Sequence, residues 1–178
     1  MKRSDLEHLI RAAGRIAGDR EMIIIGSQAI LGQFPDAPAA LLRSMEADIY
    51  PRGKPDLADK VDGAIGEGSR FHVEFGYFAQ GVGPDTATLP AGWESRLIRV
   101  ENSNTGGYAG LCLEVNDLAI SKYVAGREKD LEFTRALARH GMTKKAVLRN
   151  RLKATKLEPP LARVVRGRIE RDHPRASR

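Results

Sequence analysis

A single cysteine, Cys112, stands in the 178-residue sequence. One cysteine cannot form an internal disulfide and cannot supply a multi-cysteine zinc site, so both kinds of scaffold are excluded. Because Cys112 lies between two leucines in an apolar segment, we expect a buried core residue rather than a nucleophile.

Aromatic residues make up only 6% of the chain, and none follows Phe133. Proteins that hold single-stranded nucleic acid commonly stack its bases on aromatic rings. This scarcity therefore argues against base stacking near the C-terminus. Contacts to phosphate groups need no aromatic ring and stay open as an interpretation.

Long apolar runs are also missing, because no stretch approaches the ~18 residues that a membrane span requires. The N-terminal segment MKRSDLEHLIRAAGR lacks the apolar core of a secretory signal and has the spacing of an amphipathic helix. We therefore expect a cytoplasmic protein with no membrane partner.

Positive charge is unevenly distributed along the chain. Residues 1–101 hold 12 Lys and Arg against 15 Asp and Glu, whereas residues 102–178 hold 17 against 8, and together these give the formal net charge of +6. Such asymmetry is typical of proteins that contact nucleic acid or phosphate, although a solvated helical face has the same composition.

Hydrophobic spacing predicts helices and strands in alternation over the first two thirds of the chain and helices alone afterwards. Helices are expected at residues 4–18, 28–33, 55–65, 116–126, 128–140, 143–155 and 160–171, and strands at 22–25, 47–50, 71–78, 95–101 and 110–115. This order is typical of an α/β or α+β protein with a mixed sheet. We expect one domain over residues 1–140 and a basic, all-helical extension over residues 141–178.

Two acids lie two residues apart on the strand predicted at 47–50. Alternate residues of a strand point to the same face, so Glu46 and Asp48 are expected to point together. Mg²⁺ in proteins is often held by one or two carboxylates together with substrate phosphates. Solvated acids on an edge strand would give the same pattern, so the pair alone is weak evidence.

A glycine and a serine, Gly26 and Ser27, close the first predicted strand and open a helix. Glycine allows close backbone approach, and a serine hydroxyl beside free backbone N–H groups favours a phosphate. An ordinary turn with a serine cap has the same sequence.

A third motif spans two predicted helices from Asn116 to Leu131. It brings several cations near one junction, where they could meet a triphosphate or simply form a charged loop. The residues concerned are Asp117, Leu118, Lys122, Ala125, Arg127, Lys129 and Asp130.

The order of these three motifs resembles the nucleotidyltransferase superfamily, the DNA polymerase β-like group. There, a Gly-Ser pair after the first strand is followed by a strand with two acids around a hydrophobic residue. The nearest resemblance is to bacterial nucleotidyltransferase-like proteins of the DUF6036 type. They are distantly related to the AbiEii and MenT-type toxins of toxin–antitoxin systems, and the third motif is similar to one of the AbiEii-like branch.

The resemblance implies a nucleotidyltransferase-like mixed sheet flanked by helices. It also implies transfer of a nucleoside monophosphate from a nucleoside triphosphate to an acceptor hydroxyl, with Mg²⁺ or Mn²⁺ as cofactor. In these roles Glu46 and Asp48 hold the metal, and Gly26 and Ser27 bind phosphates. Lys122, with Arg127 or Lys129, neutralises the triphosphate, and Asp130 binds or orients those cations.

Two departures from the superfamily pattern bear on catalysis. Glu46 stands where the superfamily usually has aspartate, and the third carboxylate has no obvious match. Glu74, in the strand predicted at 71–78, is our first choice for that catalytic acid, and Asp85 in the following loop is the second. If neither reaches the metal, the protein binds nucleotide without transferring it.

Three functions remain open. The first is a nucleotidyltransferase that modifies RNA, such as a tRNA 3′ end, as a toxin–antitoxin component with a cognate partner protein. The second is a degenerate nucleotide-binding or regulatory module. The third is a nucleic-acid-binding protein that acts through its basic C-terminus.

Overall fold

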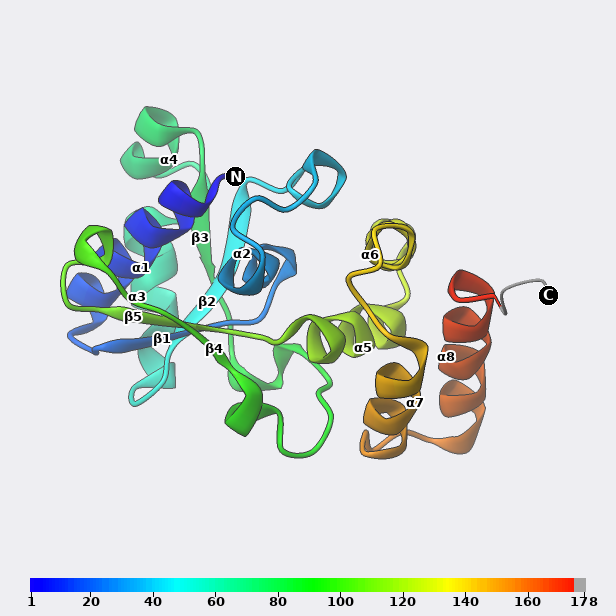
Figure 1. Ribbon diagram of the computed structural model, residues 1–178. Helices are drawn as coiled ribbons and strands as arrows, with labels where there is room; N and C mark the ends of the chain where they lie inside the picture. Colours follow the sequence, from blue (N-terminus) through cyan, green and yellow to red (C-terminus); the bar gives the residue numbers. More distant parts are fainter. Residues whose placement is uncertain (175–178) are drawn as a thin grey trace. The chain divides into compact units, whose positions relative to one another are not determined.

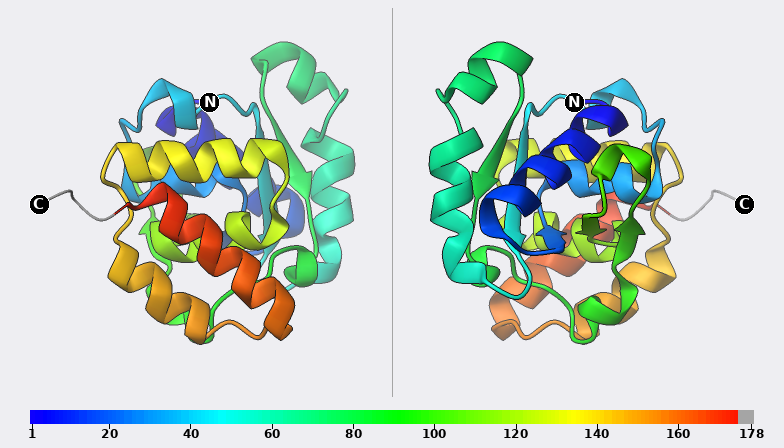
Figure 2. Two further views of the ribbon diagram at one scale, coloured as in Figure 1. Left: turned by 90° about the vertical axis from the view of Figure 1, so that its right-hand side faces the viewer. Right: turned by 90° about the vertical axis from the view of Figure 1, so that its left-hand side faces the viewer.

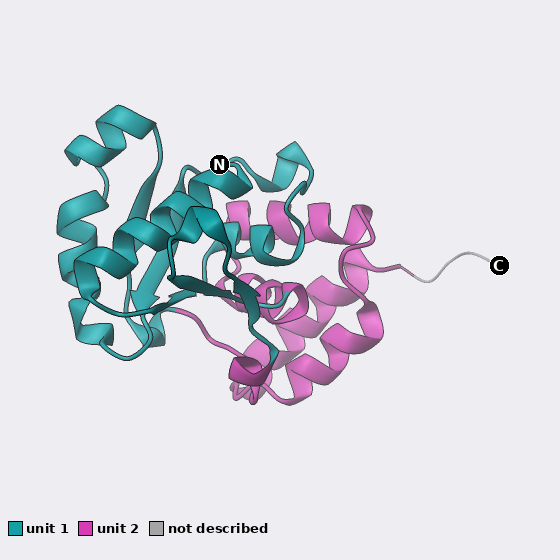
Figure 3. Cartoon of the chain, turned by 60° about the vertical axis from the view of Figure 1, so that its left-hand side comes forward, with its two compact units in different colours: residues 1–86, 96–114 teal, residues 87–95, 115–178 magenta. Residues whose placement is uncertain are grey.

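The computed structural model describes residues 1–174 in two compact units (Figures 1 and 3). The first unit comprises residues 1–86 and 96–114, and the second comprises residues 87–95 and 115–178. The boundary predicted after residue 140 falls between helices α6 and α7, inside the second unit. Of the basic segment predicted over 141–178, the last four residues lie outside the described part.

The first unit is an α+β structure built on a five-stranded sheet. Its helices are α1 (Arg3–Ala17), α2 (Ile30–Gln33), α3 (Ala58–Ile65) and α4 (Arg70–Phe75), with a 3₁₀ turn, η1 (Ser27–Ala29), immediately before α2. Its strands are β1 (Glu21–Ile24), β2 (Glu46–Pro51), β3 (Phe78–Gly81), β4 (Ile98–Val100) and β5 (Ala109–Cys112).

The sheet is mixed, as the sequence predicts, with the strand order β3-β2-β1-β5-β4. Strand β1 pairs antiparallel with β2 and parallel with β5, β2 pairs parallel with β3, and β4 pairs antiparallel with β5. Helix α1 packs against β1, β2 and β5 and against α3, which packs in turn against β2 and β3. The central strand β1 is almost fully buried because it has neighbours on both edges.

The strand predicted at 71–78 is wrong, because Arg70–Phe75 forms helix α4 and β3 begins only at Phe78. Aromatic residues at alternate positions suggested a strand, but Phe71 and Phe75 are also four residues apart, and their ring centroids lie 4.8 Å apart on one helix face. Ser69 caps the helix by accepting a hydrogen bond from the His72 N–H.

In the described part of the second unit, up to residue 174, there are four α-helices, in agreement with the helical end that the sequence predicts. They are α5 (Val115–Ala125), α6 (Glu128–Arg139), α7 (Lys145–Lys153) and α8 (Pro159–Asp172). Helices α6, α7 and α8 all pack against α5 (Figure 2). Within residues 1–174, no helix combines the length and the apolar character that crossing a membrane requires.

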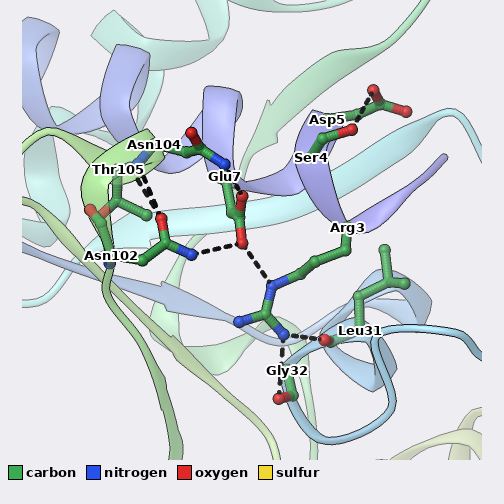
Figure 4. Close-up of polar contacts among 9 residues, drawn as sticks. All are labelled: Arg3, Ser4, Asp5, Glu7, Leu31, Gly32, Asn102, Asn104 and Thr105. Atoms are coloured by element: carbon green, nitrogen blue, oxygen red, sulfur yellow. Dashed lines mark hydrogen bonds and ion pairs between the residues drawn. The ribbon is translucent and has the colours of Figure 1, made fainter.

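A buried carboxylate, Glu7 on α1, ties together three parts of the first unit (Figure 4). The side-chain amides of Asn102 and Asn104 donate to it at 2.7 and 2.8 Å, and Arg3 donates at 3.0 Å. Arg3 also donates to the carbonyls of Leu31 and Gly32 at the end of α2. Burial raises the pKa of Glu7, but these donors outweigh it and leave the pKa below the ordinary 4.5.

This network predicts a pH-dependent contribution to stability. A carboxyl group whose pKa is lowered by folding stabilises the folded state at pH values above its pKa in the unfolded chain. This stabilisation is lost as the pH falls through the pKa of the folded state. We expect Glu7→Gln to cost about 2–3 kcal/mol at pH 7 and to cost less below about pH 4.5. Denaturant unfolding from pH 3 to 7 measures this, with exposed Glu67→Gln as the control. A loss of unfolding free energy in Glu7→Gln that does not change with pH would contradict this prediction.

Candidate functional site

The Gly26-Ser27 turn and Asp48 lie against each other in the first unit. The N–H of Ile25 donates to the Asp48 carbonyl at 3.1 Å, extending the pairing between β1 and β2 to the start of the turn. A Cβ atom on Gly26 would lie 2.2 Å from Oδ2 of Asp48 and 2.6 Å from its Cγ. The carboxylate therefore occupies the space that any larger side chain at position 26 would need.

Gly26 is needed there for space rather than for its backbone conformation. Its φ of −79° and ψ of −175° are extended values that other residues also adopt. The structure thus brings together two of the predicted motifs, which are 22 residues apart in the sequence.

The turn also presents hydrogen-bond donors. Among residues 1–174, the backbone N–H groups of Ser27 and Gln28 have no backbone acceptor, and the Ser27 hydroxyl lies at the same turn. An anionic oxygen placed at the turn would satisfy them. These donors are where the sequence predicts a phosphate group.

Glu46 and Asp48 lie two residues apart on β2 and are both partly exposed, so their side chains are on one face of the strand. Strand β3 runs parallel beside them, with Phe78 paired to Glu46 and Gln80 paired to Asp48. Residues paired in register on neighbouring strands share a face, so Gln80 stands beside Asp48.

Sequence reasoning missed Gln80, because it placed this strand too early. Which strand would pair with β2, and in which register, could not be read from local spacing.

The two candidates for a third carboxylate do not lie on the strand beside β2. Glu74 is exposed on α4, ahead of β3, and Asp85 is exposed in the 3₁₀ turn Pro84–Thr86 that follows it. Within residues 1–174, no three His, Cys, Asp or Glu side chains are grouped so that they could hold a metal ion. The two β2 carboxylates nevertheless suit Mg²⁺, which often takes one or two carboxylates and completes its shell with water and phosphate oxygens.

The cations of the third motif form a cluster around one acid in the second unit. Asp130 on α6 is buried, with Arg127 Nε at 2.6 Å and Lys122 Nζ at 3.5 Å from its oxygens. Burial raises the pKa of Asp130, but the hydrogen bond from Arg127 and the charge of Lys122 outweigh it and lower the pKa. Arg127 and Lys129 are largely exposed, whereas Lys122 is mostly covered.

A neighbouring acid of the same motif has a different partner. Asp117 on α5 is fully buried and lies 2.9 Å from Nε of Arg151 on α7. This ion pair joins α5 to the first of the two C-terminal helices.

Cys112 is confirmed as a core residue. It is fully buried in β5, and burial raises the pKa of its thiol to about 12. A thiol held protonated in this way is a poor nucleophile at neutral pH.

The five-stranded mixed sheet flanked by helices is consistent with a nucleotidyltransferase-like α+β fold. Residues 4–157 match the family described as "Nucleotidyltransferase of unknown function (DUF6036)", and the chain belongs to this family. No curated protein and no solved structure matches the chain.

The close approach at position 26 predicts the effect of adding one methyl group there. In Gly26→Ala, the new Cβ collides with the Asp48 carboxyl group, which has to turn away, and we expect a loss of about 1–3 kcal/mol. Gly63→Ala is the matched control, because a Cβ at this helical glycine has nothing within 4 Å. It should be neutral or stabilising by up to about 1 kcal/mol.

Denaturant unfolding of both variants measures the difference, and a crystal structure of Gly26→Ala shows the orientation of Asp48. Equal stability of the two variants, with Asp48 unmoved, would contradict the close approach.

Proposed function

We propose that the protein is a Mg²⁺-dependent nucleotidyltransferase that moves a nucleoside monophosphate from a nucleoside triphosphate to an acceptor hydroxyl. The observation that carries this proposal is the packing of the Gly26-Ser27 turn against Asp48. It places donors suited to a polyphosphate beside an acid suited to a metal ion. The family match supports the same class of reaction.

In this reaction, a bond forms between the acceptor oxygen and the α-phosphorus, the bond from that phosphorus to the bridging oxygen breaks, and pyrophosphate leaves. The Ser27 hydroxyl and the turn N–H groups would hold the phosphate oxygens, and Glu46 and Asp48 would hold the metal. The bound metal would neutralise charge on the attacking and leaving oxygens. Water takes the proton of the acceptor hydroxyl.

We place the acceptor on RNA, with tRNA as one candidate, because of the basic helices of the second unit. Exposed cations on α7 and α8 include Arg149, Lys153, Arg163, Arg166 and Arg171. Such a surface binds phosphates without reading sequence. A toxin–antitoxin role with a partner protein is part of the same proposal.

A nucleotide-binding module without turnover is the second candidate. The observation that favours it is Gln80, an amide at the position on β3 next to Asp48 where a third acid would complete the set. An amide oxygen is a weaker ligand for a divalent cation than a carboxylate. In this case, nucleotide would stabilise the protein but no product would form.

The catalytic proposal predicts that Asp48→Asn lowers nucleotidyl transfer at least about a hundredfold, because the carboxylate acts on the reacting phosphate. The assay incubates the protein with labelled nucleoside triphosphates, Mg²⁺ and total RNA. Asp59→Asn, an exposed acid on α3, is the control and should keep full activity. Label that does not depend on Asp48, or no label on any RNA or protein, would contradict the proposal.

The position of Gln80 predicts the effect of restoring an acid there. Gln80→Glu places a carboxylate beside Asp48 and should lower the Mg²⁺ concentration for half-maximal nucleotide binding or transfer severalfold. Mg²⁺ titration followed by calorimetry measures this. Asn150→Asp, at an exposed position on α7, is the control, and an equal effect of both variants would point to net charge alone.

A further inference from the structure

Gln28 has a fully buried side chain in which neither polar atom is hydrogen-bonded. It lies in η1, immediately after Gly26 and Ser27, and its relative exposure is 0%. Both Nε2 and Oε1 lack a partner among residues 1–174. A glutamine amide offers two donors and two acceptor lone pairs, so its whole hydrogen-bonding capacity is unused.

The other buried polar side chains of the first unit are satisfied. Glu7 accepts from three donors, and the Thr105 hydroxyl donates to the Asn102 carbonyl at 2.9 Å. Elsewhere among the described residues, Nε of Arg135 and of Arg151 are buried without a hydrogen bond, but Arg151 forms an ion pair with Asp117. Gln28 differs because both ends of its amide are unpaired.

The fold gives no reason for an amide at this position. The next three residues, Ala29, Ile30 and Leu31, are apolar and fully buried, and methionine would fill a similar volume without unpaired atoms. Burying an amide without partners costs free energy. Such costs are usually found where a group works on a ligand.

The position of Gln28 indicates which ligand. It follows the turn whose donors face no acceptor, and η1 packs against β2, the strand of Glu46 and Asp48. An amide N–H, like the Ser27 hydroxyl, donates to anionic oxygens.

We propose that Gln28 is a ligand-binding residue. Its side-chain amide becomes hydrogen-bonded when a polyphosphate chain occupies the Gly26-Ser27 turn. The free protein is less stable than it would be with an apolar side chain here, and the bound protein recovers the difference. The inference rests on the ligand class of the proposed function but does not require turnover.

The test compares Gln28→Met with the wild type by thermal unfolding, without ligand and with inorganic tripolyphosphate or the four nucleoside triphosphates with Mg²⁺. We expect Gln28→Met alone to unfold about 3–6 °C higher, because the unpaired amide is gone. The affinity of Gln28→Met for tripolyphosphate and for the nucleoside triphosphates should fall about 10- to 100-fold, as for one lost hydrogen bond to a charged group. Asn150→Met, at an exposed position on α7, is the control and should change neither.

A purely structural role of Gln28 predicts the opposite change in unfolding temperature. If an interior water satisfies the amide, Gln28→Met and Gln28→Leu unfold at lower temperature or fail to fold, and either result overturns the inference. Wild-type affinity in Gln28→Met, or no response of the wild type to either polyphosphate, also overturns it. Nucleotide binding that depends on Gln28 without any transfer supports this inference while refuting the catalytic proposal.

Discussion

The contact between the β1–η1 turn and the Asp48 carboxylate is the constraint on which the candidate site depends. Antiparallel pairing brings the end of β1 against the middle of β2, and the Ile25-to-Asp48 hydrogen bond carries that pairing into the turn. A Cβ atom at position 26 would displace the carboxylate from its present position. The same hydrogen bonds that build the sheet therefore set the distance between the Gly26-Ser27 turn and the Asp48 carboxylate.

The parallel pairing of β2 with β3 decides what completes the acid pair. It places Phe78 and Gln80 beside Glu46 and Asp48, so the row of side chains on this face contains two carboxylates and one amide. Such a set supplies few ligands to a small hard cation, which would take more of its shell from water and from the substrate's phosphates. Under the proposed function, metal affinity and nucleotide affinity are expected to be strongly coupled.

Local sequence predicted what depends on local spacing. The apolar run of β1, the helix spacing of α1 and the glycine that ends β1 each reflect a few consecutive residues, and the structure has these elements where expected. The segment from Phe71 failed because its aromatic residues fit a period of two as well as a spacing of four. Gln80 could not be found because strand register is decided by distant residues.

Gln28 was beyond sequence reasoning for a different reason, since its polarity is visible but its burial is not. The buried carboxylate of Glu7, by contrast, accepts hydrogen bonds from three donors that belong to two segments of the chain. Nothing comparable reaches the amide of Gln28 among residues 1–174. Two buried polar side chains in one unit thus have opposite hydrogen-bonding states, and the unsatisfied one adjoins the turn where a ligand is expected. Because a partner that binds only the folded protein stabilises it, the missing hydrogen bonds are best explained as belonging to the bound state.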